Sequence, residues 1–313
     1  MGIRPIDRLA ADRYTIPAIP EAVARYAQVP DTLPVGSPGK VGVLDLVFER
    51  RGERTELTGH YQKTPLQIMR PLYHDPSRPD LACVMVIAVG GGVLQGDRYR
   101  LDLTCGADAS VYVTTQAATK IYRMEQDYAT QLVSIAVGPG GSLEYLPGPV
   151  IPFAGSRFYQ RTRLTVDPSA TVILGETMLA GRLARGERHA YTAYCSDLDV
   201  HRPAGDLLFA DPVRLVPAQA PVTGPAMFGG HGVLSTLYVV TAAVAAGDLA
   251  GELHEAATRS GLTGGAGVLP GGAGAWARLL GPETPRVTAT LEHLWDIARR
   301  MTIGSPAPDR RKP

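Results

Sequence analysis

Residues 99–113 read Tyr-Arg-Leu-Asp-Leu-Thr-Cys-Gly-Ala-Asp-Ala-Ser-Val-Tyr-Val and carry the first copy of a recurring pattern. The first half alternates, with apolar side chains at Tyr99, Leu101, Leu103 and Cys105 and charged or polar side chains between them. A period of two is typical of a β-strand that buries one side. The Gly-Ala-Asp-Ala stretch is rich in turn-forming residues and leads into a second strand, so this segment predicts a strand, a tight turn and another strand.

The same design returns twice along the chain. A strand-like segment at 132–137 turns at 138–141, and another at 158–166 turns at 167–170. The three turns begin at residues 106, 138 and 167 and are therefore 32 and 29 residues apart. Hairpins that repeat about every thirty residues predict an all-β protein with a layered β-sandwich or β-helix-like architecture. Other all-β folds remain an alternative, because any antiparallel sheet shows similar strand and turn signals.

The chain outside the repeats suggests one domain with loose ends. Residues 1–40 are rich in Pro and Gly and predict a loose N-terminal arm, and 304–313 predict a disordered tail. Between them, 41–303 predict a single β-rich domain with two short helices. One helix is expected at 249–260, and another begins at Thr284-Pro285 with an apolar face that we expect to pack on the core.

Composition excludes several classes of function. The 313 residues include 31 Lys and Arg against 30 Asp and Glu, which gives a formal net charge of +1. This balance gives no support to a nucleic-acid partner or to binding an anionic membrane. Three separated cysteines without a C-x-x-C pair, and no secretory hydrophobic region at the start, predict a cytoplasmic protein.

The common catalytic motifs are not found in the sequence. The glycine-rich stretch at 90–97 lacks the Gly-Lys-Ser/Thr ending of a P-loop, and a strand-like segment follows it, so it predicts a turn that needs positive φ. Glu144 and Glu176 lie in strand-like segments of successive repeats. If they faced one cleft, they would fit a β-sandwich carbohydrate-active hydrolase. This enzyme is the alternative to a non-enzymatic function, and a general interaction module is a third possibility.

Metal-ligand patterns are weak. No H-x-H or C-x-x-C pair occurs, so a tight resident metal site is not predicted. His231, in a Gly-Gly-His-Gly loop, and the carboxyls of Glu144 and Glu176 are candidates for transient metal contact. Polar residues directly follow a buried strand at 114–123, and they predict either a satisfied turn or the lining of a cavity or partner surface.

Five ordered blocks resemble the UreD (also called UreH) family of urease accessory proteins. They are Gly91-Gly92 with Gly96-Asp97, the Thr-Thr-Gln-Ala-Ala-Thr-Lys-Ile-Tyr run at 114–122, the Glu-Tyr-Leu-Pro stretch at 144–153, the Arg-Phe-Tyr-Gln strand at 157–162, and the Gly-Arg-x-x-Arg-Gly-Glu loop at 181–187. The chain departs from the family where a His-Pro-Pro lead often precedes the Gly-Gly turn. It has Ala88-Val89-Gly90 there, so no histidine acts at that point.

The resemblance implies a non-enzymatic factor that helps to deliver nickel to apo-urease. It implies partners of the UreF type and of the nickel-carrying UreG GTPase type, no tightly bound cofactor, and a transient nickel ion that passes through the interior. From the polarity of their segments, we expect residues of the blocks to line this route or a partner surface. The candidates are Asp97, Thr115, Gln116, Lys120, Tyr122, Arg157 and Arg182, with Glu144 and Glu176 as further lining.

Overall fold

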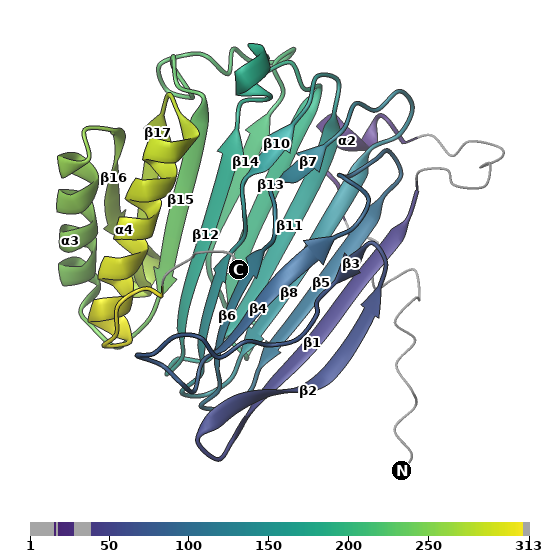
Figure 1. The fold of residues 1–313 in the computed structure, drawn as a ribbon. Coiled ribbons are helices and arrows are strands. Elements are labelled where there is room, and N and C mark those ends of the chain that lie inside the picture. Colours follow the sequence, from purple (N-terminus) through teal and green to yellow (C-terminus); the bar gives the residue numbers. More distant parts are fainter. Residues whose placement is uncertain (1–15, 17, 28–38, 309–313) are drawn as a thin grey trace.

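Two facing β-sheets form the body of the protein in a computed structural model that describes residues 16, 18–27 and 39–308 (Figure 1). The seven-stranded sheet has the order β14 (Leu207–Leu215), β13 (Ala193–His201), β11 (Arg157–Val166), β8 (Ala129–Val137), β5 (Arg98–Cys105), β1 (Val41–Arg51) and β2 (Arg54–Lys63). The ten-stranded sheet has the order β16 (Thr263–Val268), β17 (Gly274–Gly281), β15 (Val233–Val240), β12 (Thr171–Leu179), β9 (Ser142–Leu146), β6 (Ser110–Thr115), β4 (Ala82–Ala88) and β3 (Leu66–Gln67), with β10 (Val150–Pro152) and β7 (Thr119–Ile121) beside this path.

The layered β prediction is confirmed, but the repeats are not hairpins. Each turn joins a strand of the seven-stranded sheet to a strand of the ten-stranded sheet, so its two strands do not pair with each other. Instead β5, β8, β11 and β13 pair in parallel in one sheet, and β4, β6, β9 and β12 pair in parallel in the other. Each repeat is therefore one coil of a β-solenoid that stacks on the next. A sequence pattern of strand and turn cannot distinguish the two cases, because it does not record which strand is the partner.

The predicted helices cover the outer face of the ten-stranded sheet at one end (Figure 1). They are α3 (Ala246–Arg259) and α4 (Thr284–Thr302), and the short 3-10 turns at Leu183–Arg185 and Pro270–Gly272 lie in connections. Val287, Leu291, Leu294 and Ala298 of α4 are buried against the sheet, as the apolar periodicity predicts. None of the helices among the described residues has both the length and the apolar character that a membrane span requires.

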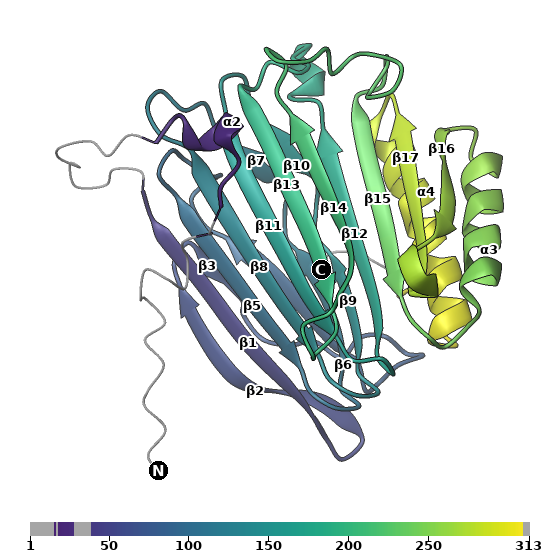
Figure 2. The same ribbon diagram turned by 180° about the vertical axis from the view of Figure 1, so that it is seen from behind.

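Apolar residues fill both sides of the ten-stranded sheet. One large cluster lies between the two sheets, and a second lies between the ten-stranded sheet and the two long helices. A small third cluster includes Val23 of α2 (Glu21–Ala24) and Tyr159 of β11. Figure 2 shows α2 over the outer face of the seven-stranded sheet, near β11 and β13. Where the two long helices cover it, the ten-stranded sheet is thus a buried middle layer, whereas most of the seven-stranded sheet has one face toward solvent.

Parts of the predicted arm and tail pack on the domain. Residue 16 and residues 18–27 of the arm are described, and Ile16 is buried. In the tail, Ser305 and Pro308 are buried, and the Ala307 N–H donates to Asp296 Oδ1 at 2.8 Å. Residues 1–15, 17, 28–38 and 309–313 lie outside the described residues. The division into an arm, one domain and a tail stays a prediction.

The solenoid has two different ends. The short turns at 106–109, 138–141 and 167–170 stack at one end, where the Asp108 N–H donates to the Pro139 carbonyl at 2.9 Å. The longer connections 89–97, 116–128, 147–156 and 180–192 lie at the other end and contain β7, β10 and the Leu183–Arg185 turn. In the first of them, Gly90, Gly91 and Gly96 have positive φ, which confirms the predicted turn.

Candidate functional site

A row of polar side chains crosses the inner face of the seven-stranded sheet. Register pairs Tyr99 of β5 with Gln131 of β8, Gln131 with Gln160 of β11, and Gln160 with Ser196 of β13. In parallel strands, paired residues point to the same face, so these four side chains form one continuous row. The rows before and after it are mainly apolar, with Phe158 in one of them fully buried. The polar row is therefore a single layer inside an apolar core.

A second polar row lies opposite, on the inner face of the ten-stranded sheet. Glu176 of β12 pairs with Thr236 of β15, and Thr236 pairs with Arg278 of β17. The Arg278 Nε–H donates to Thr236 Oγ1 at 3.0 Å, and the guanidinium forms an ion pair with Asp211 of β14 across the sheets. Tyr238 OH also donates to Asp211, at 2.5 Å. The ion pair between Arg278 and Asp211 therefore lies at this end of the polar layer.

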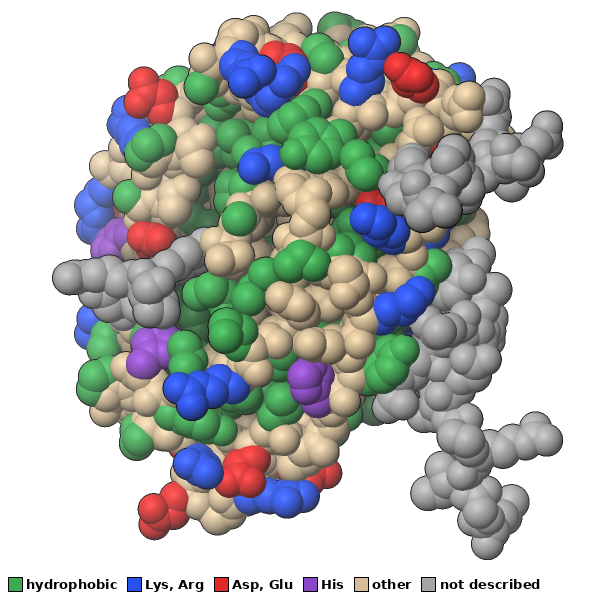
Figure 3. Space-filling view, turned by 45° about the vertical axis from the view of Figure 1, so that its right-hand side comes forward, with side chains coloured by type: hydrophobic (Ala, Val, Ile, Leu, Met, Phe, Trp, Pro, Cys, Tyr) green, Lys and Arg blue, Asp and Glu red, His purple; other side chains and the backbone are tan. Residues whose placement is uncertain are grey.

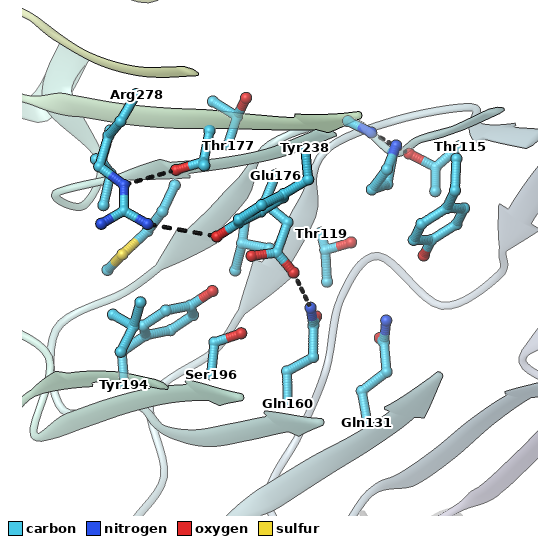
Figure 4. Close-up of a pocket in the computed structure, with 18 residues that line it drawn as sticks. Thr115, Thr119, Gln131, Gln160, Glu176, Thr177, Tyr194, Ser196, Tyr238 and Arg278 are labelled. Atoms are coloured by element: carbon cyan, nitrogen blue, oxygen red, sulfur yellow. Dashed lines mark hydrogen bonds between the residues drawn. The ribbon is translucent and has the colours of Figure 1, made fainter. Parts of the chain in front are cut away.

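The two rows meet at Glu176. Gln160 Nε2 donates to Glu176 Oε1 at 3.2 Å, which joins the two sheets through one hydrogen bond (Figure 4). Figure 4 shows Gln131, Gln160, Ser196 and Tyr194 on one side of the space and Glu176 and Tyr238 on the other. The arrangement is a carboxyl group with amide and hydroxyl neighbours and with the Arg278–Asp211 ion pair at one end. Such a set offers oxygen ligands from both sheets without a preformed cage.

The layer encloses two neighbouring cavities. One, of about 50 Å³, is lined by Glu176, Gln160 and Arg278, and the other, of about 160 Å³, is lined by Gln116 and Lys120 among others. Thr115, Thr119, Gln131 and Tyr145 line both. Since a water molecule needs roughly 10–15 Å³ of such space, each cavity has room for several waters. The polar layer is therefore an interior space and not only a set of paired side chains.

Burial raises the pKa of Glu176 to about 7. That value also includes a smaller upward contribution from the nearby Asp211 carboxylate and downward contributions from Arg278 and from the hydrogen bond that Gln160 donates. Desolvation disfavours the charged form of a carboxyl group, so it is the dominant cause. Near neutral pH this carboxyl exchanges readily between a protonated form and a form that can bind a cation.

The ten-stranded sheet is interrupted beside Glu176. The ladder between β9 and β12 ends at the pair Tyr145 and Leu174, and pairing with β12 resumes only at Met178, through β10. Pro147 and Gly148 occupy the gap, and the Gly148 N–H donates to Thr115 Oγ1 at 2.8 Å. A Cβ on Gly148 would lie 3.0 Å from that same oxygen, so glycine permits this close approach.

On the outer side of this gap lies a groove of about 560 Å³, which we call the outer groove. Thr115, Pro147, Gly148 and Thr177 line both the outer groove and the cavity at Glu176. Among the described residues, Thr115 is the only one that lines all three of these spaces. The interruption thus places the interior polar layer next to the surface of the molecule.

The predicted lining residues divide into those in the layer and those outside it. Glu176, Thr115, Gln116 and Lys120 line one or both of the cavities, with Gln116 and Lys120 at exposed positions, and their part in a nickel route stays a prediction. Asp97 lines neither cavity: it is buried in the glycine-rich connection, where it accepts hydrogen bonds from the Lys40 N–H at 2.9 Å and from Tyr99 OH at 2.8 Å. Its position supports a structural role in the turn.

Glu144 lies on the opposite face of the ten-stranded sheet from Glu176. It pairs in register with Ile173, three residues before Glu176, and alternation turns the two carboxyls to opposite sides. Glu144 accepts a hydrogen bond from Trp295 Nε1 at 2.5 Å and lies 3.2 Å from Arg299 Nε. The hydrolase alternative is therefore wrong, because it requires both carboxyls to face one cleft.

His231 lies in the connection between β14 and β15, outside the lining of the three spaces. The other candidates lie at the end with the long connections. Arg182 forms an ion pair with Glu187 and lies over the Phe153 ring at 4.5 Å, and Tyr122 contacts the edge of the same ring at 5.1 Å. These contacts join three of the five sequence blocks.

Arg157 joins the arm to this end of the solenoid, because its guanidinium lies 4.1 Å from the Tyr26 ring centroid. The candidate residues thus lie in the polar layer, at the end with the long connections or in a structural turn, except for Glu144 under α4 and His231 in the connection between β14 and β15.

Four residues of the polar layer carry no sequence motif that predicts them as site residues: Gln131, Gln160, Ser196 and Arg278. The repeat contains a signal that could have found two of them. Tyr99, Gln131 and Gln160 each lie seven residues before the first residue of their turn, and Thr115, Pro147 and Glu176 each lie nine residues after it. Equal offsets in a solenoid place residues in one layer, so aligning the repeats on their turns would have placed Gln131 and Gln160 in the same layer as Glu176.

The site contains few strong metal ligands. Among the described residues, no group of three or more His, Cys, Asp or Glu side chains is placed to hold a metal ion. Cys83, Cys105 and Cys195 are buried free thiols, and burial raises the pKa of each.

Two sheets that enclose a polar layer, with the motif-bearing connections gathered at one end, define a β-solenoid scaffold. The family model of the UreD urease accessory protein matches residues 40–313. The urease accessory protein UreD 2 of Streptomyces griseus is 54% identical over 293 residues, which cover 93% of this chain and all of that protein. The UreD proteins of Cenarchaeum symbiosum and Haloarcula marismortui are each 37% identical, over 90% and 97% of this chain and 99% and 97% of their own lengths.

The chain therefore belongs to the UreD urease accessory protein family. Its members are non-catalytic urease maturation factors that take part in assembling the nickel metallocentre. Membership confirms the resemblance seen in the five blocks and decides against a general interaction module.

Proposed function

We propose that this chain passes nickel to apo-urease through the polar layer between its two sheets. The observation that carries the proposal is the meeting of the two polar rows at Glu176, where Gln160 and the carboxyl are 3.2 Å apart. A carboxylate with amide and hydroxyl neighbours can replace part of the hydration of a divalent cation and then release it. A tighter set of imidazole and thiolate ligands would retain nickel instead of transferring it.

We infer further that the end with the long connections docks the partners. This inference is supported by contacts between three of the sequence blocks at that end, where Arg182 and Tyr122 both pack against Phe153. We propose a UreF-type partner and a nickel-carrying UreG-type GTPase as partners, with apo-urease as the recipient, in the cytoplasm. GTP hydrolysis then belongs to the partner, in agreement with a glycine-rich turn at 90–97 that lacks the P-loop residues.

The experiment is co-expression of urease with its accessory proteins and either this chain or its Glu176→Gln variant. Nickel per urease active site is the first readout, and co-purification of the accessory proteins is the second. We expect Glu176→Gln to lower nickel loading about tenfold while leaving co-purification unchanged, because glutamine keeps the size but loses the charge. Glu252→Gln changes an exposed carboxyl on α3 and is the matched control.

Full nickel loading with Glu176→Gln would contradict the interior route. Full loading without the chain would contradict the nickel-delivery function altogether. Loss of co-purification in the variant would show that Glu176 acts on assembly and not on the ion.

A further inference from the structure

Four side chains line both interior cavities, so they lie where the two spaces adjoin. Among the described residues these are Thr115 at the end of β6, Thr119 of β7, Gln131 of β8 and Tyr145 of β9. Each carries a side-chain oxygen and none carries a charge, and we call the four the oxygen cluster. The cluster draws on four consecutive strands and on both sheets. A cation that moved from one cavity to the other would therefore pass neutral oxygens on several sides.

Charged side chains lie away from this cluster. Inside the molecule, Glu176 and Arg278 line only the smaller cavity, and Lys120 lines only the larger one. On the outside, Figure 3 shows that hydrophobic and uncharged side chains fill much of the middle of the face that it views, whereas many charged side chains lie toward its top and bottom. The attraction of the oxygen cluster for a cation therefore depends on its own hydroxyl and amide dipoles.

Tyr145 carries the strongest evidence that the oxygen cluster holds a ligand. It is 4% exposed, and none of the described residues forms a hydrogen bond with its hydroxyl. Burial raises the pKa of Tyr145, so the hydroxyl keeps its proton and its oxygen stays neutral. Buried polar groups are almost always hydrogen-bonded to protein or to ordered water. An unpaired hydroxyl at the boundary of two cavities therefore points to water or a hydrated ion within them.

Gln131 supplies a second unpaired group, from the opposite sheet. Its neighbours in the polar row are committed, because Tyr99 OH donates to Asp97 at 2.8 Å and Gln160 Nε2 donates to Glu176 at 3.2 Å. In the part of the chain that the structure describes, the Gln131 amide has no hydrogen-bond partner. Figure 4 shows it pointing into the same space as Gln160. Its amide oxygen is therefore available to a ligand.

The two threonines of the oxygen cluster differ. Thr115 Oγ1 accepts from the Gly148 N–H and donates to the Ala117 carbonyl, both at 2.8 Å, so it is engaged in the local turn. The Thr119 N–H donates to the Pro149 carbonyl at 2.9 Å, which fixes the backbone, but the hydroxyl of Thr119 has no partner among the described residues. Three oxygens of the cluster, on β7, β8 and β9, are thus left unpaired by the protein.

We propose that Thr119, Gln131 and Tyr145 bind a hydrated divalent cation between the two cavities. Hard divalent cations take neutral oxygen ligands, and they keep several of their own waters when few protein oxygens reach them. The adjoining cavities of about 50 and 160 Å³ give those waters room. Because the site has no charge of its own, it holds the ion weakly.

For nickel, this site deepens the proposed function, on which its part in delivery rests. Glu176 lines the cavity on one side of the oxygen cluster, so a passing ion meets neutral oxygens and a carboxyl group in succession. Binding of a cation to the cluster does not depend on delivery. The site and the route can therefore fail separately.

The first test is equilibrium dialysis of the purified full chain against Ni²⁺, with Tyr145→Phe as the variant. Phenylalanine keeps the aromatic ring and removes only the hydroxyl, so we expect the nickel affinity of the interior site to fall about threefold or more. Tyr128→Phe is the matched control, because Tyr128 is also buried and lies outside the lining of both cavities. It should bind nickel as the natural chain does. Urea denaturation shows that each variant is folded.

Gln131→Glu tests the same site by a gain of binding. Glutamate has nearly the shape of glutamine and adds a charge to the oxygen cluster, so we expect nickel to bind about tenfold more tightly. Nickel loading of urease in the co-expression system should then fall, because a tighter site releases the ion more slowly. A purely structural role of Gln131 would not give tighter nickel binding.

Equal nickel binding by Tyr145→Phe and the natural chain would overturn the proposal, because the unpaired hydroxyl would then contact only water. The absence of any gain with Gln131→Glu would overturn it too. Weaker binding by Tyr145→Phe with full loading of urease would support the cation site and place it off the delivery route. Unchanged binding by Tyr145→Phe, together with a loading defect in Glu176→Gln, would remove the site and leave the route.

Discussion

Glu176 and Glu144 illustrate how the position of a glutamate within the fold sets its chemistry. Both lie in neighbouring parallel strands, yet Glu176 faces a polar cavity and Glu144 faces a buried arginine and a tryptophan. Burial raises the pKa of both carboxyls, and the Arg299 charge counteracts this at Glu144. Glu176 therefore lies beside open polar space, as the proposed cation exchange requires, whereas Glu144 holds α4 against the ten-stranded sheet.

The raised pKa of Glu176 predicts a pH dependence of stability. The value rises from 4.5 to about 7 on folding, so the folded state keeps a proton that the unfolded state releases. Stability from this group is therefore present below pH 4.5 and is lost as pH rises to about 7. We expect the unfolding free energy of the natural chain to fall, relative to that of Glu176→Gln, by roughly 2–3 kcal/mol across this window.

Urea denaturation of both proteins near the two ends of that window measures this difference. A constant difference would show that Glu176 is not shifted in the folded protein.

The sequence could not separate these two glutamates, for a physical reason. A strand with one face in solvent alternates apolar and polar residues, but β9 and β12 are covered on both sides. Leu143 and Tyr145 face the other sheet, and Ile173 and Leu179 face the helices, so apolar residues occur at both parities. Without a polar face as reference, the direction of each carboxyl could not be assigned from its own segment.

At the scale of elements, a buried ion network fastens α4 to the ten-stranded sheet. Arg299 is fully buried and lies 3.1 Å from Asp75 and 3.2 Å from Glu144. Trp295, one turn earlier on α4, stacks on Tyr112 of β6 with ring centroids 5.3 Å apart. The network therefore joins the helix to three separate parts of the chain.

Removing the arginine should strongly destabilise the protein. Arg299→Met leaves two carboxyls buried without a cation, which costs about 3–5 kcal/mol in comparable networks. The triple variant Asp75→Asn, Glu144→Gln, Arg299→Met removes all the charges and should recover most of that loss. Arg300→Met, at the exposed neighbouring arginine paired with Asp296, should cost less than about 1 kcal/mol.

Chemical denaturation of the four proteins gives these free energies. If Arg299→Met unfolded at the same urea concentration as Arg300→Met, the network would not hold the helix.

Element prediction succeeded where the signal is local and failed where it depends on pairing. The start of α4 at Thr284, the burial of its apolar face and the turn at 90–97 follow from a proline in the first turn, periodicity and glycine φ, although Glu283 and not Thr284 is the N-cap. The pairing of β5 with β8 instead of with β6 involves residues about thirty positions apart. Such contacts are not encoded in a short window, so the repeats were read as hairpins.

Across the whole molecule, the solenoid explains why polar residues far apart in sequence form one layer. Each coil contributes one strand to each sheet, and one residue of each strand faces the polar layer. Stacking of the coils aligns these residues into two facing rows. The gap at Pro147 and Gly148 then places the layer beside the outer groove, and Thr115 lines every one of these spaces. The fold therefore places the two cavities of the polar layer and the outer groove side by side, which is the arrangement that the proposed route requires.

The most direct test of this account is nickel per urease active site when Thr115→Trp replaces the natural chain in the co-expression system. A tryptophan there should fill the point that the three spaces share, so we expect nickel loading to fall about tenfold while the accessory proteins still co-purify. Thr58→Trp, on an exposed position of the edge strand β2, is the matched control and should load urease fully. Full loading with Thr115→Trp, in a complex that assembles normally, would contradict an interior route for nickel.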